Sequence, residues 1–185
     1  DRRASSSSAL RALGGGVVSR GRGTVIDVGG QDARVIALWP SGKMANFVMK
    51  GKWAAGTGRF LEVMASIIRL DVDGLDAEAA KAAAPAAISS TCTVFAESEV
   101  ISQLANGVKR PDLVAGICRS VASRVAALAR RAGVTEQVCL SGGVARNDAV
   151  RQALSDELNV PVSVDPLAQY FGAIGAALWA YKQTT

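Results

Sequence analysis

Residues 24–32 read TVIDVGGQD, an apolar run that leads into two glycines. The β-branched run over 24–28 predicts a strand, and residues 33–38 predict its partner across a hairpin turn. Gly29 and Gly30 in that turn have no Cβ, so backbone N–H groups there are open to a phosphate. Taken alone, the same residues are explained equally well by an ordinary Gly-Gly hairpin turn.

Two carboxylates flank this turn. Asp27 lies near the expected end of the first strand, and Asp32 lies just before the second. Either could hold Mg²⁺ through water, because carboxylate oxygens are ligands that this ion prefers.

A second glycine turn occurs at residues 140–147, which read LSGGVARN. A buried-type strand over 137–140 leads to Gly142 and Gly143, and a helix over 148–158 follows. The positive end of a helix dipole favours an anion or a nucleotide, although glycines also serve routine strand-to-helix loops. Two such turns in one chain predict that both converge on a single nucleotide.

The remaining pattern predicts one α/β domain over 24–185, after a flexible or degenerate N-terminal segment over 1–23. Strands followed by helices in this order are typical of that fold class. The other expected elements are a strand over 46–49, helices over 57–70, 74–83, 96–105 and 111–131, a strand over 160–164 and a helix over 168–181.

Composition excludes several classes of function. The net charge is +5, but the first 23 residues carry +4 of it, so the body is almost neutral and we expect no nucleic-acid partner. The chain has no histidine, which excludes histidine triads and histidine metal sites. It also lacks a long apolar run and a secretory signal, so we expect a cytoplasmic protein without a membrane segment.

The glycine turns resemble two nucleotide loops of the actin/Hsp70/hexokinase superfamily. The first is similar to its second phosphate loop and the second to its adenosine loop, while residues 172–177, GAIGAA, match its connecting helix. More narrowly, residues 54–62, AAGTGRFLE, and 89–100, SSTCTVFAESEV, resemble the BadF/BadG/BcrA/BcrD-type ATPases. These are the activators of 2-hydroxyacyl-CoA dehydratases and the ATPase subunits of benzoyl-CoA reductase.

The resemblance covers about residues 24–180 and implies an actin/Hsp70-like (ribonuclease H-like) ATPase domain whose N-terminal half is largely missing. It implies ATP hydrolysis by a dimer of like subunits, with a [4Fe–4S] cluster that passes a low-potential electron to a dehydratase or reductase component. The implied catalytic residues are Asp27 and Gln31, and the implied cluster ligand is Cys92. The residues implied for ATP and Mg²⁺ are Gly29, Gly30, Asp32, Gly56, Thr57, Gly58, Gly142, Gly143, Asn147 and Gly172.

The chain departs from the family pattern at the cluster. Trp53 stands where the family has its first cluster cysteine, and an indole cannot replace a thiolate at iron. Cys118 and Cys139 fall in apolar surroundings and are expected in the core. A nucleotide-binding subunit without a cluster therefore stays an alternative, and a sugar kinase of the same superfamily is another.

Two further features qualify the expected ATP site. The superfamily's first phosphate loop is not found, so we expect only half of the nucleotide cleft. Thr57 has a second interpretation, because a threonine before a helix often caps its first turn.

Overall fold

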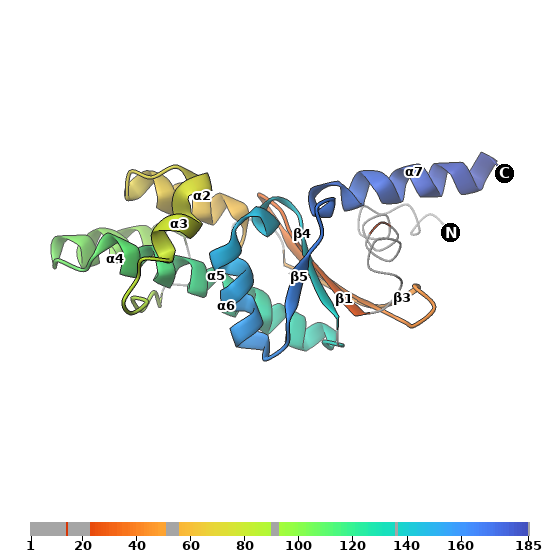
Figure 1. Ribbon diagram of the computed structural model, residues 1–185, viewed down its shortest axis with the longest axis horizontal. Helices are drawn as coiled ribbons and strands as arrows, with labels where there is room; N and C mark the ends of the chain where they lie inside the picture. Colours follow the sequence, from red (N-terminus) through yellow and green to blue (C-terminus); the bar gives the residue numbers. More distant parts are fainter. Residues whose placement is uncertain (1–13, 15–22, 51–55, 90–92, 136, 185) are drawn as a thin grey trace.

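The computed structural model describes residue 14 and residues 23–50, 56–89, 93–135 and 137–184, and a five-stranded sheet lies at its centre. The strand order is β3-β2-β1-β4-β5 (Figure 1). Strands β1, β2 and β3 are antiparallel neighbours, whereas β1, β4 and β5 run parallel. The bounds are Gly23–Val28 for β1, Ala33–Leu38 for β2, Met44–Lys50 for β3, Val138–Ser141 for β4 and Val162–Val164 for β5.

The predicted hairpin is confirmed. Val28 is paired with Ala33 at the turn and Gly23 with Leu38 at the open end. Every residue of β1 and β2 is buried, as expected for β-branched and apolar side chains in central strands. The third strand is longer than the predicted 46–49, and β5 is shorter than the predicted 160–164.

The longest helix, α5 (Arg110–Ala132), covers one face of the sheet. Its apolar residues recur at spacings of three and four and are buried, as at Leu113, Ile117 and Val121. Pro111 lies in its first turn, and Gly133, with φ of 84°, ends it. Helix α6 (Asp148–Leu158) packs beside α5 and next to β5.

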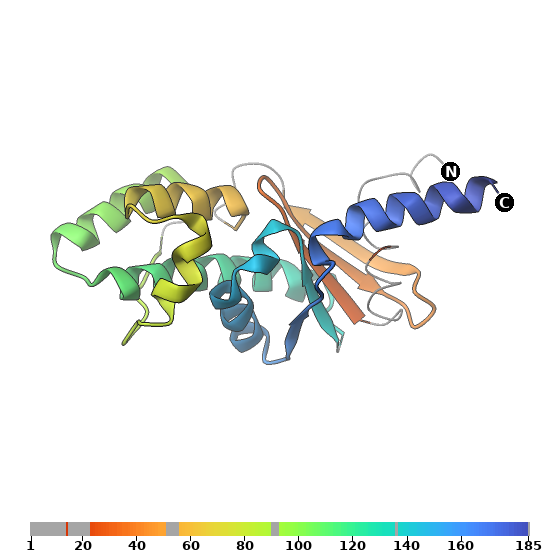
Figure 2. The ribbon, with the colours of Figure 1, turned by 45° about the horizontal axis from the view of Figure 1, so that its top comes forward.

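A group of helices extends from one end of the sheet. It contains α2 (Gly58–Ile67), the 3₁₀ helix η1 (Val72–Gly74), α3 (Leu75–Ala79), α4 (Thr93–Ala105) and the N-terminal half of α5. Figure 2 shows this group at one end of the elongated molecule and α7 (Phe171–Thr184) at the other. Helix α7 projects from the body on the side of the sheet opposite α5 and α6.

The helix predicted over 96–105 begins earlier, at Thr93. Three other predicted helices are shorter than expected or are divided. The helix expected over 57–70 ends at Ile67, since Arg69 has a left-handed φ of 55°. The one expected over 74–83 is only α3, preceded by η1. The one expected over 168–181 is divided into a 3₁₀ helix, η3 (Ala168–Tyr170), and α7.

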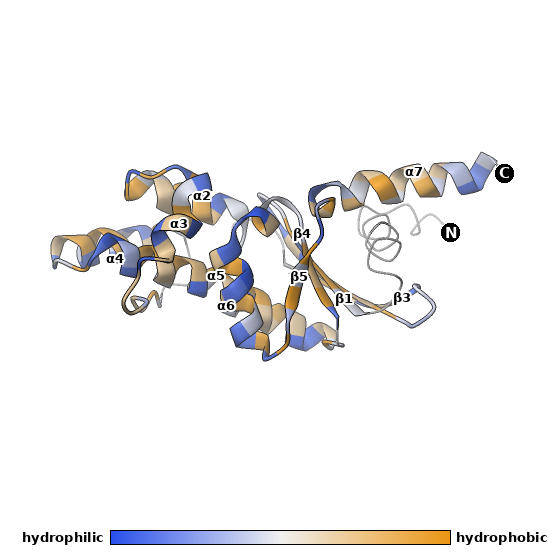
Figure 3. Ribbon diagram, viewed as in Figure 1, coloured by the Kyte–Doolittle hydropathy of each residue, from blue (hydrophilic) through white to orange (hydrophobic). Residues whose placement is uncertain are grey.

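Hydropathy follows this arrangement. Figure 3 shows apolar colour along the sheet and over most of α7, with polar residues gathered at the C-terminal end of that helix. Within the described residues, each helix is too short or too polar to span a bilayer.

Candidate functional site

The two glycine turns lie side by side at one edge of the sheet. Strands β1 and β4 are parallel neighbours, with Asp27 opposite Ser141, so both turns leave the same edge. A Cβ added to Gly142 would lie 2.4 Å from the backbone oxygen of Val28. Gly142 also has a φ of 86°, which only glycine adopts readily. The convergence expected from the sequence is therefore present in the fold.

Helix α2 begins directly on the first turn. The N–H of Gly58 donates to the carbonyl of Gly29 over 2.8 Å, and the N–H of Arg59 donates to that of Gly30 over 2.9 Å. A Cβ at Gly58 would lie 3.2 Å from the Gly29 oxygen and 3.4 Å from Cγ2 of Val144. The small residue thus lets the start of α2 approach both glycine turns.

Thr57 holds the N-cap position of α2 and is buried, with 2% of its surface exposed. Its side chain makes no hydrogen bond to the first turn of the helix. The interpretation of Thr57 as a side-chain cap is therefore wrong, because a capping hydroxyl accepts from a backbone N–H of that turn. Gly56, just before it, lies against Arg124, where an added Cβ would be 3.4 Å from the Cβ of the arginine.

The carboxylates of the first turn have different surroundings. Asp27 is buried, and its Oδ1 accepts a hydrogen bond from Ser141 Oγ over 3.0 Å. Asp32 forms an ion pair with Arg34, with 2.6 Å between its Oδ2 and Nη2 of the arginine. Arg34 therefore offsets the charge of Asp32. Gln31, between the two carboxylates in the chain, is exposed.

The second turn leads into α6 through a capping residue. Asn147 Oδ1 accepts the N–H of Val150 over 2.9 Å, which satisfies one of the free donors at the helix start. The N–H of Gly142 reaches the carbonyl of Ala168 over 3.3 Å, so η3 also borders this turn. Gly172, in the first turn of α7, is half-buried close by in the chain.

Two of the glycines named from the sequence, Gly30 and Gly143, have empty space where a side chain would lie. A Cβ added to Gly30 or to Gly143 would meet no atom within 4 Å. Unlike Gly142, these glycines are not required by the packing of the protein itself. Cys92 and Trp53 lie outside the described residues.

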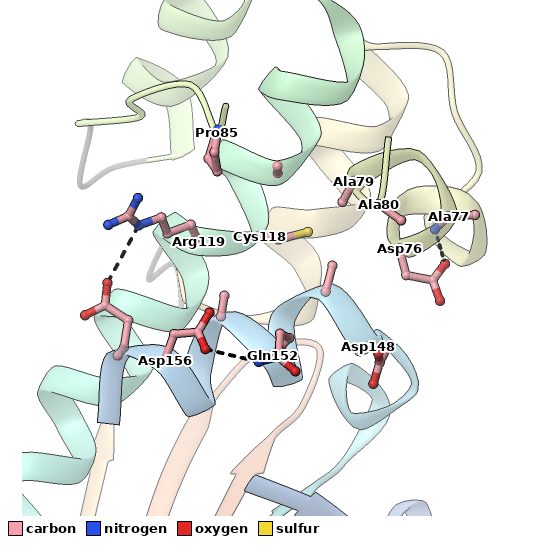
Figure 4. A pocket seen from close by; sticks show the side chains of 14 residues that line it. Asp76, Ala77, Ala79, Ala80, Pro85, Cys118, Arg119, Asp148, Gln152 and Asp156 are labelled. Atoms are coloured by element: carbon pink, nitrogen blue, oxygen red, sulfur yellow. Dashed lines mark hydrogen bonds and ion pairs between the residues drawn. The ribbon is translucent and has the colours of Figure 1, made fainter. Parts of the chain in front are cut away.

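A cavity of about 890 Å³ opens next to the second turn, between α3, α5 and α6 (Figure 4). This volume is typical of a small-molecule site. The cavity reaches Asp148, which directly follows Asn147, but none of the site residues named from the sequence lines it. Its lining residues are Asp76, Ala77, Ala79, Ala80, Pro85, Ala115, Cys118, Arg119, Asp148, Ala149, Gln152, Ala153, Asp156 and Glu157.

The charged residues of the cavity wall are mostly acidic. Figure 4 shows Asp76 and Asp148 at one end and Arg119 and Asp156 at the other. Asp148 pairs with Arg151 over 2.6 Å, and this hydrogen bond lowers the pKa of the carboxyl group. Such walls suit the amino and hydroxyl groups of a ligand better than its phosphates.

Sequence reasoning missed this cavity. One signal was present, because Asp148 follows the second turn and Gln152 lies one helical turn further along the same face. The residues that come from α3 and α5 belong to no motif, and their position depends on how the helices pack.

The described cysteines do not form a metal site. Burial raises the pKa of the Cys118 thiol to about 12 and also raises that of Cys139, so both are held as neutral thiols. Across the described part of the chain, no three histidine, cysteine or acidic residues lie close enough to hold a metal ion.

The sequence pattern of the BadF/BadG/BcrA/BcrD ATPase family matches residues 8–180. The chain belongs to this family. The resemblance expected from residues 54–62 and 89–100 is thus confirmed. The order of antiparallel and parallel strands is that of the actin/Hsp70-like ATPase fold, which confirms the expected fold class.

The relatives of this chain include activators of 2-hydroxyacyl-CoA dehydratases. The (R)-2-hydroxyglutaryl-CoA dehydratase activating ATPase of Acidaminococcus fermentans is 58% identical over 160 residues, which are 86% of this chain and 61% of the relative. The crystal structure of the dehydratase component A from that organism has a TM-score of 0.92 at 53% identity and covers 96% of this chain and 68% of its own.

A second solved structure contains a nucleotide analogue. The activator of the 2-hydroxyisocaproyl-CoA dehydratase from Clostridium difficile, with bound ADPNP, has a TM-score of 0.90 at 47% identity. The match covers 96% of this chain and 66% of that one. The chain spans 60–61% of the length of the three dehydratase activators it matches.

Proposed function

We propose that this chain is the larger part of an ATP-hydrolysing activator of a 2-hydroxyacyl-CoA dehydratase or a benzoyl-CoA reductase. The observation that carries the proposal is the contact of both glycine turns with the start of α2. A cavity lies next to the second turn and reaches Asp148. Membership of the ATPase family and the ADPNP-bound relative support it.

The nucleotide would extend from the two glycine turns to the cavity. Its phosphates fit at Gly30 and Gly143, where no side chain fills the space, and its nucleoside fits the acidic cavity beyond Asp148. Asp27 would hold Mg²⁺ through water, since its carboxylate is fixed at the end of β1. Gln31 and Asp27 would position the attacking water, as the family resemblance implies.

Nucleotide binding is tested by calorimetry with ATP and Mg²⁺. Replacing Gly30 or Gly143 by alanine puts a methyl group into the open space, so we expect weaker binding and unchanged unfolding. The matched control is Gly74→Ala, because Gly74 also has nothing within 4 Å but belongs to neither glycine turn. Equal ATP affinity in all four proteins would refute the proposal.

Electron transfer is the finer part of the proposal. The described residues do not fit an iron–sulfur cluster. Cys118 and Cys139 are buried thiols, and no three cysteine, histidine or acidic side chains in the described part of the chain lie close enough to hold a metal. Trp53 further favours the alternative, a nucleotide-responsive subunit that activates its partner by a conformational change without a cluster. Either version would pair with a like subunit, which a molar-mass measurement in solution tests.

Iron and sulfide analysis of protein purified without oxygen separates the two versions. Bound iron and sulfide would support the cluster, and their absence would support the subunit without one. The variant Trp53→Cys then shows whether one missing thiolate is the cause, since it should gain the absorbance of a cluster only in that case.

A further inference from the structure

Arg146 and Asp73 form an ion pair that joins two separate parts of the protein. Arg146 ends the 3₁₀ helix η2 (Gly143–Arg146), which follows the second glycine turn, and Asp73 lies in η1. The distance from Nη2 to Oδ2 is 3.5 Å, and the side chains are 60% and 66% exposed. An exposed pair of this kind contributes little to stability, so it can be exchanged for another partner.

The pair lies beside the proposed nucleotide site. Asp73 is three residues before Asp76, and Arg146 is two residues before Asp148, and these two acids line the same end of the cavity. In η2, Val144 is close to Gly58 at the start of α2. Arg146 therefore lies in the chain between the second glycine turn and the cavity residue Asp148.

Three other arginines near the two turns have shorter ion-pair distances than Arg146. The ion-pair distance is 2.6 Å for Arg34 with Asp32, 2.6 Å for Arg151 with Asp148 and 2.9 Å for Arg59 with Glu62. Within this group, Arg146 has the longest ion-pair distance. Arg119 lies further from its partner Glu157, at 4.0 Å, but it lines the other end of the cavity, beside Asp156. Among these arginines next to the turns, Arg146 therefore has the ion pair that a new anion can replace at the lowest cost.

We propose that Arg146 exchanges Asp73 for the phosphates of a bound nucleotide. This inference rests on the proposed nucleotide-binding function. It adds two residues that change nucleotide affinity in opposite directions. A polyphosphate carries more negative charge than one carboxylate, and guanidinium groups bind phosphate through paired, charge-assisted hydrogen bonds. Arg146 thus raises nucleotide affinity, and Asp73 lowers it by competing for the same group.

The test is calorimetric titration with ATP, because the two partners have opposite effects. Arg146→Gln should raise the Kd for ATP about tenfold, the loss expected for one charge-assisted contact. Asp73→Asn should lower the Kd about two- to fivefold, since Arg146 is then free before the nucleotide arrives. A merely structural ion pair would instead give the same change for both variants, and that result would overturn the inference.

Two controls complete the experiment. In the Arg146→Gln background, Asp73→Asn should have no further effect on the Kd, because Asp73 acts only through Arg146. Adenosine, which has no phosphate, should bind both single variants and the unmodified protein alike, and a change with adenosine equal to that with ATP would overturn the phosphate contact. If the unmodified protein binds no ATP, the proposed function itself fails, which is a different result.

Discussion

Ser141 Oγ donates a hydrogen bond to Asp27 Oδ1 over 3.0 Å, and this bond joins the two strands that lead into the glycine turns. Both residues are buried, with 0% and 4% of their surfaces exposed. A hydrogen bond to a charged acceptor is strong where water is excluded. The carboxylate proposed to lie near magnesium is thus held in place by the neighbouring turn.

Ser141→Ala should destabilise the protein. The change removes the hydroxyl donor from a buried carboxylate, and we expect the free energy of unfolding to fall by about 1.5–3 kcal/mol in a urea titration. The control is Ser163→Ala in β5, whose hydroxyl donates to the Val138 carbonyl over 3.1 Å from an exposed position. Equal losses in both variants would contradict a special role for the Asp27 bond.

Gly142→Ala should cost more stability than any other change in the second turn. The new Cβ would lie 2.4 Å from the Val28 oxygen, and the φ of 86° is strained for alanine. The backbone strain alone is worth about 1–3 kcal/mol, so we expect at least that loss in thermal or urea unfolding. Gly143→Ala is the matched control, since it meets no atom within 4 Å, and a similar loss there would refute the steric argument.

The convergence of the turns was predictable from the sequence. Each turn follows a buried-type strand, and the two strands are β1 and β4, which are parallel neighbours and end at one edge of the sheet. The cavity was not predictable in the same way. Its walls include alanines such as Ala80 and Ala153, and small residues form a cavity only when α3, α5 and α6 are placed together.

The hydroxyl of Thr57 is a second feature that the sequence did not determine. Sequence pattern places a threonine at the N-cap of α2, and the structure confirms that position. Whether the hydroxyl bonds to the helix depends on its rotamer and on the packing around this buried residue, which the local sequence does not determine.

Stability should fall at high pH because of Cys118. Burial raises its thiol pKa from 9.0 to about 12, so between these values the thiol ionises in the unfolded chain but not in the folded one. The contribution of the neutral Cys118 thiol to the free energy of unfolding is fully present below pH 9 and is lost as the pH rises toward 12. The loss should be about 1.4 kcal/mol per pH unit.

The measurement is the free energy of unfolding of the protein and of Cys118→Ala between pH 8 and about 10.5. The alanine variant has a small cavity and a lower stability overall, so the comparison concerns the slope with pH. Its curve should be flatter above pH 9, since the thiol is gone. Parallel curves would show that Cys118 ionises alike in both states.

Filling the cavity should block the nucleoside without disturbing the fold. Ala80 is the C-cap residue of α3, is exposed and lines the cavity, so Ala80→Trp puts a large ring into the space proposed for the base. We expect the Kd for ATP to rise about tenfold or more, because burial of the nucleoside is lost, while the thermal unfolding midpoint stays the same. The control is Ala105→Trp, which adds the same ring at the exposed end of α4, outside the cavity lining. Unchanged ATP affinity in Ala80→Trp would place the nucleoside elsewhere, even if the glycine turns bind the phosphates.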